Sequence, residues 1–310
     1  MYRLLMTTYT VYLAIHQFDH ELMNELKLKG IKIADKKDRL FIVEGDHPPM
    51  IWAQMTGFRA QFMDIESIND GAKKLKEHGR NWGLFTVDFH RRAQLIQDNL
   101  PKIKKKVLEF QEPLPTAPMG FWTLWEQNKI LYTPHTSSLF PLGEMDFNED
   151  KVMPPSRAYL KLWEFFTVYA PNTPARGVAI DVGSCPGGWT WVLRTMNFDK
   201  VISVDKAPIE KRISDLGRIE FRQESAFGLD PEQFPEIEWF CSDIICYPER
   251  LLNLVKRFMD SGKVRNFVCT IKYQSQTDWE NTLKFLDIPG SQIVHLHHNK
   301  HEVTWFLKGI

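Results

Sequence analysis

The chain has 310 residues, with 39 Lys and Arg balanced by 39 Asp and Glu. This length allows two modest hydrophobic cores, and a net charge of zero excludes whole-molecule attraction to nucleic acid or membrane, so any attraction must come from local patches. Four cysteines without a C-x-x-C pair indicate reduced thiols in a cytoplasmic protein rather than disulfides or zinc ligands. We expect neither a signal peptide nor a membrane span, and either Met1 or Met6 can serve as the start.

The first 111 residues alternate short strand and helix patterns, which predicts an α+β domain. Strands are expected at 9–15, 31–33, 40–43 and 84–88, and helices at 18–29, 50–56, 67–78 and 91–107, the last interrupted at Pro101. Two basic clusters lie in this half, near 27–39 and 91–106. Each cluster fits either a solvated surface or a surface that contacts phosphates.

Three prolines within residues 112–118 mark the end of this domain, and residues 112–150 are expected to form a hairpin followed by a linker. The hairpin pattern surrounds the turn Glu126-Gln127-Asn128. Trp122 and Trp125 on this hairpin can stack on bases, but aromatic residues in such places more often pack against a core.

Residues 151–310 show the pattern of a doubly wound α/β domain. Ser156 is expected to cap a first helix, in which Lys161 lies off the apolar stripe and faces either water or a site. The stripe is formed by Tyr159, Leu162, Trp163, Phe166 and Ala170. Helices are then expected at 189–196, 249–259 and 276–286, and an antiparallel strand pair closes the chain.

Polar residues end the apolar strands of this domain. They are Asp181, Asp205, Asp243 and Lys272, and Glu302 stands at the entrance of the last strand. Ligands of open α/β sheets gather at the carboxyl ends of strands, so these residues are site candidates.

A glycine-rich turn after the first of these strands predicts a small-molecule site. It reads Asp181-Val182-Gly183-Ser184-Cys185-Pro186-Gly187-Gly188-Trp189. The turn lacks the G-x-G-x-x-G spacing of dinucleotide loops, which argues against a nicotinamide-dependent enzyme. A carboxylate at the strand end suits a positively charged ligand such as the sulfonium of S-adenosylmethionine, and Asp205 suits ribose hydroxyls. The alternative is a turn that only reverses the chain.

A lysine at the end of a buried strand is costly unless it is paired or neutral. Asp243, Glu302 and Lys161 can surround Lys272 either as a structural salt-bridge cluster or as neighbours that tune a catalytic base, and spacing favours neither. A second ammonium nearby would make Lys272 easier to deprotonate, so that it can accept the proton of a weakly acidic hydroxyl.

Several of these segments resemble the FtsJ-like 2'-O-ribose RNA methyltransferases. The likeness is carried by Pro155-Ser156-Arg157-Ala158-Tyr159-Leu160-Lys161-Leu162, by the glycine-rich turn, by Cys241-Ser242-Asp243 and by the strand ending at Lys272. It covers residues 134–310 well and is looser in the N-terminal half. The resemblance implies a Rossmann-like methyltransferase domain at 151–310 and an N-terminal RNA-binding domain at 1–111, with a THUMP-like module in the N-terminal half.

The resemblance also implies site residues and ligands. A catalytic tetrad would fall on Lys161, Asp243, Lys272 and Glu302. S-adenosylmethionine would be held by Asp181, Gly183, Ser184, Cys185, Pro186, Gly187, Gly188, Trp189, Asp205 and Asp243. Where the family places an acid against the adenine amino group this chain has Ser225, so Glu224 or a backbone carbonyl is expected there. The implied substrate is RNA, with large-subunit ribosomal RNA favoured.

Other chemistries are weaker. His295, His297, His298 and His301 precede Glu302, but strand alternation disperses their side chains, so we expect no metal site. Cys185 lacks a paired histidine and is not expected to act as a nucleophile. The alternatives to the methyltransferase of ribosomal RNA are a catalytically silent RNA-binding protein that keeps the pocket as structure, and a methyltransferase of transfer RNA or mRNA.

Overall fold

The computed structural model describes residues 7–174 and 176–309, and the candidate start residues Met1 and Met6 lie outside them. The chain divides into two compact units. The first comprises Met1–Leu108 and Pro113–Asp146, and the second Glu109–Glu112 and Phe147–Ile310. Among the helices described, none is both long enough and apolar enough to cross a bilayer.

The second unit is built on a seven-stranded sheet in the order β12-β11-β10-β13-β14-β16-β15. Its strands are β10 (Val178–Val182), β11 (Lys200–Asp205), β12 (Ile219–Gln223), β13 (Ile237–Ser242), β14 (Val264–Lys272), β15 (Gln292–Val294) and β16 (Glu302–Lys308). Neighbouring strands from β12 to β14 are parallel, whereas β16 runs antiparallel to both β14 and β15. This order confirms the predicted doubly wound, Rossmann-like sheet with an antiparallel C-terminal strand.

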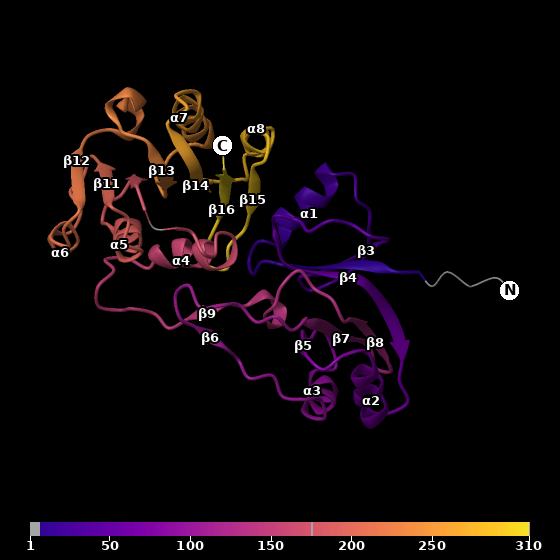
Figure 1. Cartoon of the computed structure of the whole chain (residues 1–310). Helices are drawn as coiled ribbons and strands as arrows, with labels where there is room; N and C mark the ends of the chain where they lie inside the picture. The colour runs from indigo at the N-terminus through magenta and orange to yellow at the C-terminus, as the bar shows by residue number, and fades with distance from the viewer. Residues whose placement is uncertain (1–6, 175, 310) are drawn as a thin grey trace. The chain divides into compact units, whose positions relative to one another are not determined.

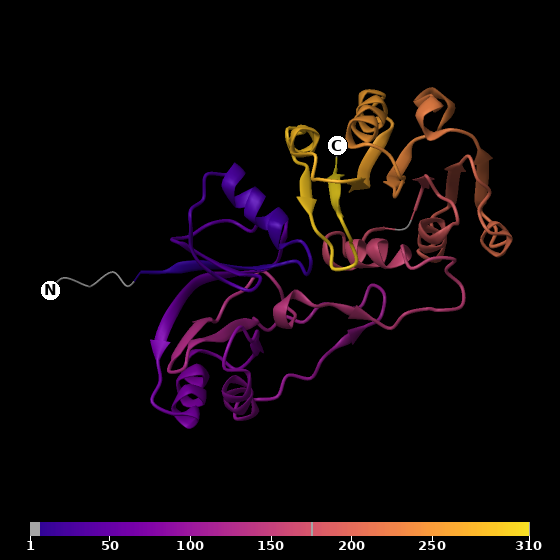
Figure 2. The ribbon, with the colours of Figure 1, turned by 180° about the vertical axis from the view of Figure 1, so that it is seen from behind.

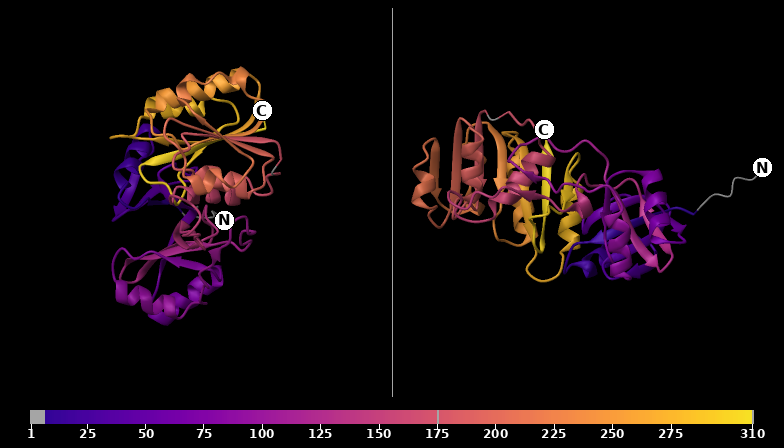
Figure 3. Two further views of the ribbon diagram at one scale, coloured as in Figure 1. Left: turned by 90° about the vertical axis from the view of Figure 1, so that its left-hand side faces the viewer. Right: turned by 90° about the horizontal axis from the view of Figure 1, so that it is seen from below.

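Helices cover both faces of this sheet (Figure 1, Figure 2). The pair α4 (Tyr159–Val168) and α5 (Gly188–Thr195) lies on one face, and α7 (Pro248–Asp260) and α8 (Trp279–Leu286) lie on the other, as the left view of Figure 3 shows. The shorter helices are α6 (Lys211–Ser214), η2 (Ala226–Gly228) and η3 (Pro231–Gln233). Because both faces are covered, the central strands are apolar almost without interruption.

The start of α4 differs from the prediction. The helix begins at Tyr159 after Ala158, with no side-chain cap, so the expected capping role of Ser156 is wrong. Residues 155–158 form a bend and a turn, and the Ser156 hydroxyl lies against Gly188, where an added Cβ would lie 3.0 Å from Ser156 Oγ. The predicted apolar stripe of α4 is confirmed, since all five of its residues are buried.

The first unit contains another seven-stranded sheet, in the order β2-β3-β1-β4-β8-β7-β5. Its strands are β1 (Tyr9–Ala14), β2 (Ile33–Lys37), β3 (Leu40–Glu44), β4 (Ala53–Asp64), β5 (Trp82–Leu84), β7 (Gly120–Glu126) and β8 (Lys129–Thr133). Helix α1 (Asp19–Leu28) lies on one side of it, and α2 (Ile68–His78) and α3 (His90–Asp98) lie on the other (Figure 1). The remaining elements are η1 (Pro141–Gly143) and the two-stranded sheet of β6 (Val107–Leu108) and β9 (Asp146–Phe147).

Several expectations about this unit change. The helix expected at 91–107 ends at Asp98, and residues 101–106 form no helix. The hairpin at 120–133 belongs to the N-terminal sheet, because β8 pairs with β4 and β7 pairs with β5, whereas we expected it in a separate segment, 112–150. The helix expected at 50–56 is wrong, since β4 begins at Ala53. The amides of Ile51 and Trp52 donate to the buried carboxylate of Glu25 (both 3.0 Å) rather than to helical carbonyls.

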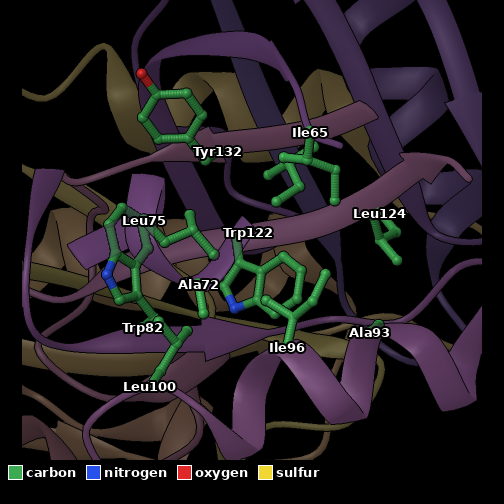
Figure 4. Packing of buried hydrophobic residues seen from close by; sticks show 11 residues of the cluster. Ile65, Ala72, Leu75, Trp82, Ala93, Ile96, Leu100, Trp122, Leu124 and Tyr132 are labelled. Atoms are coloured by element: carbon green, nitrogen blue, oxygen red, sulfur yellow. The ribbon is translucent and has the colours of Figure 1, made fainter. Parts of the chain in front are cut away.

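Both hairpin tryptophans are buried. Trp122 belongs to a cluster between α2, α3 and the sheet (Figure 4), where its indole donates to Gln97 Oε1 (2.8 Å). Trp125 belongs to a second cluster, with Val11 and Leu131 among its members. These positions confirm the packing interpretation, and neither ring is available to stack on a base.

Candidate active site

The sheet topology brings three of the predicted catalytic residues to one edge. Parallel pairing of β13 with β14 places Asp243, which follows β13, near Lys272 at the end of β14. The antiparallel strand β16 begins where β14 ends, and its first residue, Glu302, pairs directly with Lys272. The fourth residue, Lys161, comes from α4.

These four side chains form one ion-pair cluster around Asp243. Lys161 Nζ donates to Asp243 Oδ1 (2.6 Å) and to Glu302 Oε1 (3.1 Å). Lys272 Nζ donates to the backbone oxygen of Asp243 (2.6 Å) and lies 3.3 Å from Asp243 Oδ1. The Lys161 side chain is only 6% exposed, whereas that of Lys272 is 19% exposed. Lys272 is therefore the more accessible of the two amines.

A cavity of about 300 Å³ joins this cluster to the glycine-rich turn, and its size suits a small ligand. It is lined by Ser156, Ala158, Asp181, Gly183, Ser184, Cys185, Pro186, Gly188, Trp189, Asp205, Asp243, Ile244, Ile245 and Lys272. Sequence reasoning missed Ser156, Ala158, Ile244 and Ile245 as lining residues. The position of Ile244 and Ile245 directly after a strand-ending acid was the available signal.

Gly183 is required by both conformation and space. Its φ of +81° lies in the left-handed region, and a Cβ there would lie 2.6 Å from the Cβ of Ile244. The turn can therefore pass close to the β13 loop only with glycine at this position. The indole of Trp189 donates to Ala158 O (2.9 Å), which ties the entry of α4 to the same turn.

Asp181 is the most deeply buried acid of the cavity wall. Its Oδ2 accepts from Thr190 Oγ1 (2.7 Å), while Oδ1 has no partner among the described residues. Burial is the main cause that raises the pKa of Asp181 to about 7; the bond from Thr190 opposes this rise, and the nearby carboxylate of Asp243 contributes to it. A positively charged ligand would favour the ionised carboxylate and so lower the pKa of Asp181.

Asp205 and Ser184 add groups that can bind a hydroxylated ligand. Asp205 accepts from the amides of Cys185 (3.0 Å) and Ala207 (2.9 Å), one on each carboxylate oxygen, and each oxygen keeps a lone pair. Ser184 Oγ is buried without a partner in the described part of the chain. Together with Asp181 these groups fit S-adenosylmethionine, which carries a sulfonium, an ammonium and ribose hydroxyls.

Three further sequence expectations concern residues around this cavity. Glu224 and Ser225 follow the carboxyl end of β12, beside β11 and Asp205, but neither lines the cavity. Their adenine-binding role stays a prediction. The pKa of the Cys185 thiol is raised, first by partial burial and then by Asp205 and Glu210, so the thiol is protonated at neutral pH. That state opposes a nucleophilic role.

The histidines near the C-terminus do not converge. His298 pairs with Glu164 (Nδ1 to Oε2, 2.7 Å), and His295 Nε2 bonds to Lys300 O (2.9 Å). Over residues 7–174 and 176–309, no group of three or more His, Cys, Asp or Glu side chains is arranged to hold a metal ion.

Comparison with solved structures gives low scores. A putative ribosomal RNA methyltransferase from Plasmodium falciparum is 18% identical, with a TM-score of 0.39 over 50% of this chain and 97% of that chain. A putative methyltransferase from Streptococcus mutans, solved with SAH, is 11% identical, with a TM-score of 0.33 over 43% of this chain and 88% of that chain. At these scores the likeness adds nothing to the strand order described above.

Comparison by sequence is more informative. Residues 154–276 match the model of the FtsJ-like methyltransferase family. Ribosomal RNA large subunit methyltransferase M of Xanthomonas oryzae is 31% identical over 300 residues, which cover 90% of this chain and 78% of that protein.

The protein of the same name from Stenotrophomonas maltophilia is 30% identical over 171 residues, which cover 50% of this chain and 47% of that protein. In several such alignments the chain thus spans only about half the length of its relative. Because it covers 90% of this chain, the Xanthomonas match extends beyond the second unit into the first. The chain therefore belongs to the FtsJ-like methyltransferases, in the family of ribosomal RNA large subunit methyltransferase M.

Proposed function

We propose that this protein is an S-adenosylmethionine-dependent 2'-O-ribose methyltransferase whose substrate is large-subunit ribosomal RNA. One observation carries the proposal: the amine of Lys272 opens onto the same cavity as the glycine-rich turn, while Asp243 holds it from behind. A base and a donor site are then within reach of one substrate hydroxyl. The substrate itself is inferred from the names of the relatives.

In this proposal the turn holds the donor through groups of three kinds. Asp181 faces the charged aminoacyl end, Asp205 accepts from ribose hydroxyls, and the backbone near Gly183 approaches closely because no side chain intervenes. When bound, S-adenosylmethionine supplies a sulfonium methyl group, and the electron pair of the broken bond to carbon returns to sulfur.

Lys272 acts as the base. In its neutral form the amine accepts the proton of the 2'-hydroxyl, and the hydroxyl oxygen forms the new bond to the methyl carbon. Two bonds from Lys272 to Asp243, at 2.6 and 3.3 Å, fix the direction of the amine. Positioning of the two reacting groups in line supplies much of the rate enhancement.

Lys161 and Glu302 organise the far side of Asp243. Lys161 bridges the two carboxylates, so Asp243 is shared by two amines and cannot rotate away from Lys272. The structural salt-bridge interpretation of the cluster explains the buried pairs, but it gives no reason for Lys272 to line a cavity. On the substrate side, Ile245 lines the same cavity and is 78% exposed, which suits contact with a nucleotide.

The two basic clusters of the first unit differ in how many of their charges are paired. In the 27–39 cluster, Lys29, Lys36 and Lys37 form ion pairs with Glu25, Asp19 and Asp88. Lys27 and Lys32 of that cluster are exposed and have no ion pair among the described residues. In the 91–106 cluster, Lys105 pairs with Asp146, whereas Arg91, Lys102 and Lys104 are exposed and carry no ion pair within the residues described. Unpaired cations are the ones that can release counterions from RNA. We therefore assign the main RNA contact to 91–106.

Replacing Arg91, Lys102 and Lys104 together with alanine is expected to weaken RNA binding and to leave cofactor binding unchanged. The plot of log binding constant against log salt concentration has a negative slope, and its magnitude should decrease by about two units, since each lost phosphate contact contributes ~0.7 to 0.9. A matched triple variant, with alanine at the paired lysines 29, 36 and 74, should change the slope less. Equal slopes for both triple variants would refute the assignment.

The function is tested by mapping ribose methylation in RNA from cells with and without the gene. We expect one 2'-O-methyl group to disappear from large-subunit ribosomal RNA, and purified protein with S-adenosylmethionine to restore it. Loss of a methyl group from transfer RNA or mRNA instead would keep the chemistry and change the substrate. Absence of any lost methyl group, together with no cofactor binding by calorimetry, would favour a catalytically silent RNA-binding protein.

A further inference from the structure

Helix α4 carries two charged residues, Lys161 and Glu164, and both are buried to 5% exposure. A spacing of three residues places them on neighbouring positions of the helix surface. Lysine and glutamate are almost never buried unless paired, because an unpaired charge loses its hydration. The proposed mechanism uses Lys161 and leaves Glu164 unexplained.

Glu164 bonds to the loop between β15 and β16. Its Oε1 accepts from the amide of His297 (2.7 Å), and its Oε2 accepts from the amide of His298 (3.1 Å). The same Oε2 pairs with Nδ1 of the His298 ring (2.7 Å), whose side chain is 13% exposed. One carboxylate therefore holds two consecutive backbone amides and a side chain.

This loop leads directly to the candidate active site. Four residues beyond His298 is Glu302, the first residue of β16, and its Oε1 accepts from the amide of Lys300 (3.4 Å) as well as from Lys161. Helix α4 is thus bonded to this short segment at two places. Glu164 bonds to the loop, and Lys161 bonds to Glu302, which follows the loop. Strand pairing with Lys272 fixes the backbone of Glu302 but does not orient α4.

We propose that Glu164 is a positioning residue for the methyl-transfer reaction. Its three bonds fix the rotation of α4 about the helix axis, and this rotation sets the Lys161 ammonium between Asp243 and Glu302. The effect on the reaction is indirect, because Glu164 does not line the cavity. The inference rests on the function proposed above, and it adds a residue that acts through Lys161.

The test uses full-length protein, tritiated S-adenosylmethionine and total RNA from cells that lack the gene, under single-turnover conditions. Glu164→Ala is expected to slow methyl transfer at least about tenfold, since small displacements of catalytic groups cost that much or more. Glu164→Gln should be intermediate, because its carbonyl still accepts one amide. Affinity for S-adenosylhomocysteine should not change in either variant. Glu280→Ala removes an exposed, paired helical glutamate and should behave as wild type.

Two measurements separate positioning from simple stabilisation. In a Lys161→Ala background, Glu164→Ala should have no further effect on the rate, because a residue that acts through Lys161 has nothing left to position. Acylation of Lys161, read by mass spectrometry, should be faster in Glu164→Ala than in wild type, since the amine is less firmly held.

Wild-type rates per cofactor-binding site in Glu164→Ala, or additive losses in the double variant, would overturn the proposal. If wild-type protein transfers no methyl group to any RNA, the proposed function fails instead. In that case the acylation rates still decide the role of Glu164, and equal labelling of Lys161 in both proteins would exclude it.

Discussion

Lys272→Ala is expected to lower the rate of methyl transfer by about 10²- to 10⁴-fold, the range that loss of a general base produces. Cofactor affinity should remain within measurement error of wild type, because the amine of Lys272 bonds to Asp243, whereas the residues proposed to hold the donor are Asp181 and Asp205. Single-turnover transfer and calorimetric binding of S-adenosylhomocysteine measure the two effects separately.

Lys272→Arg distinguishes base catalysis from placement of a positive charge. A guanidinium keeps the charge but does not lose its proton in proteins, so it should not restore the rate. Lys284→Ala, which removes an exposed lysine paired with Glu280, serves as the control and should leave both measurements unchanged. Full turnover by Lys272→Ala would remove this lysine from the mechanism.

Much of the candidate active site in the second unit was predictable from residues that end strands. Asp181, Asp205, Asp243 and Lys272 each follow an apolar run, and in a parallel sheet such ends share one edge. The sequence predicted Glu302 near Lys272 but not the register that makes them direct partners, because the register of an antiparallel strand depends on a loop whose hydrogen bonds are not local. One of those bonds comes from Glu164, over 130 residues earlier in the chain.

The N-terminal unit was predicted less well, and the reasons are equally specific. Residues 50–56 carry no pattern that reveals Glu25, whose buried carboxylate takes the amides of Ile51 and Trp52. Likewise the hairpin of β7 and β8 looks independent in sequence. Its β8 strand nevertheless pairs with β4, which ends about 65 residues before β8 begins. Non-local pairing of this kind leaves no local signal. The two basic clusters looked equivalent in sequence for the same reason. One of the acids that pair with the lysines of 27–39 is Asp88, which lies far along the chain from Lys37.

The second large effect is expected for Asp181, whose burial raises its pKa to about 7. A bound cation favours the carboxylate, so binding below this pKa must release a proton. Affinity for S-adenosylmethionine should therefore rise with pH, and the dissociation constant should be roughly tenfold larger at pH 6 than at pH 8. Asp181→Asn should remove this dependence and weaken binding at pH 8 by about 10- to 100-fold, as expected for a lost hydrogen bond to a charged group.

The same substitution should stabilise the protein without ligand. Because the folded carboxyl keeps its proton up to about pH 7 while the unfolded one loses it near 3.8, stability decreases as pH rises between these values. Asparagine cannot ionise, so at pH 8 Asp181→Asn should melt at a higher temperature than wild type, whereas near pH 4 the two should coincide. Asp215→Asn, at an exposed acid whose side chain has no partner among the described residues, controls for loss of one negative charge and should change neither binding nor melting. A lower melting temperature for Asp181→Asn at pH 8, or an unchanged pH dependence of binding, would mean that Asp181 stabilises the fold and does not bind a charged ligand.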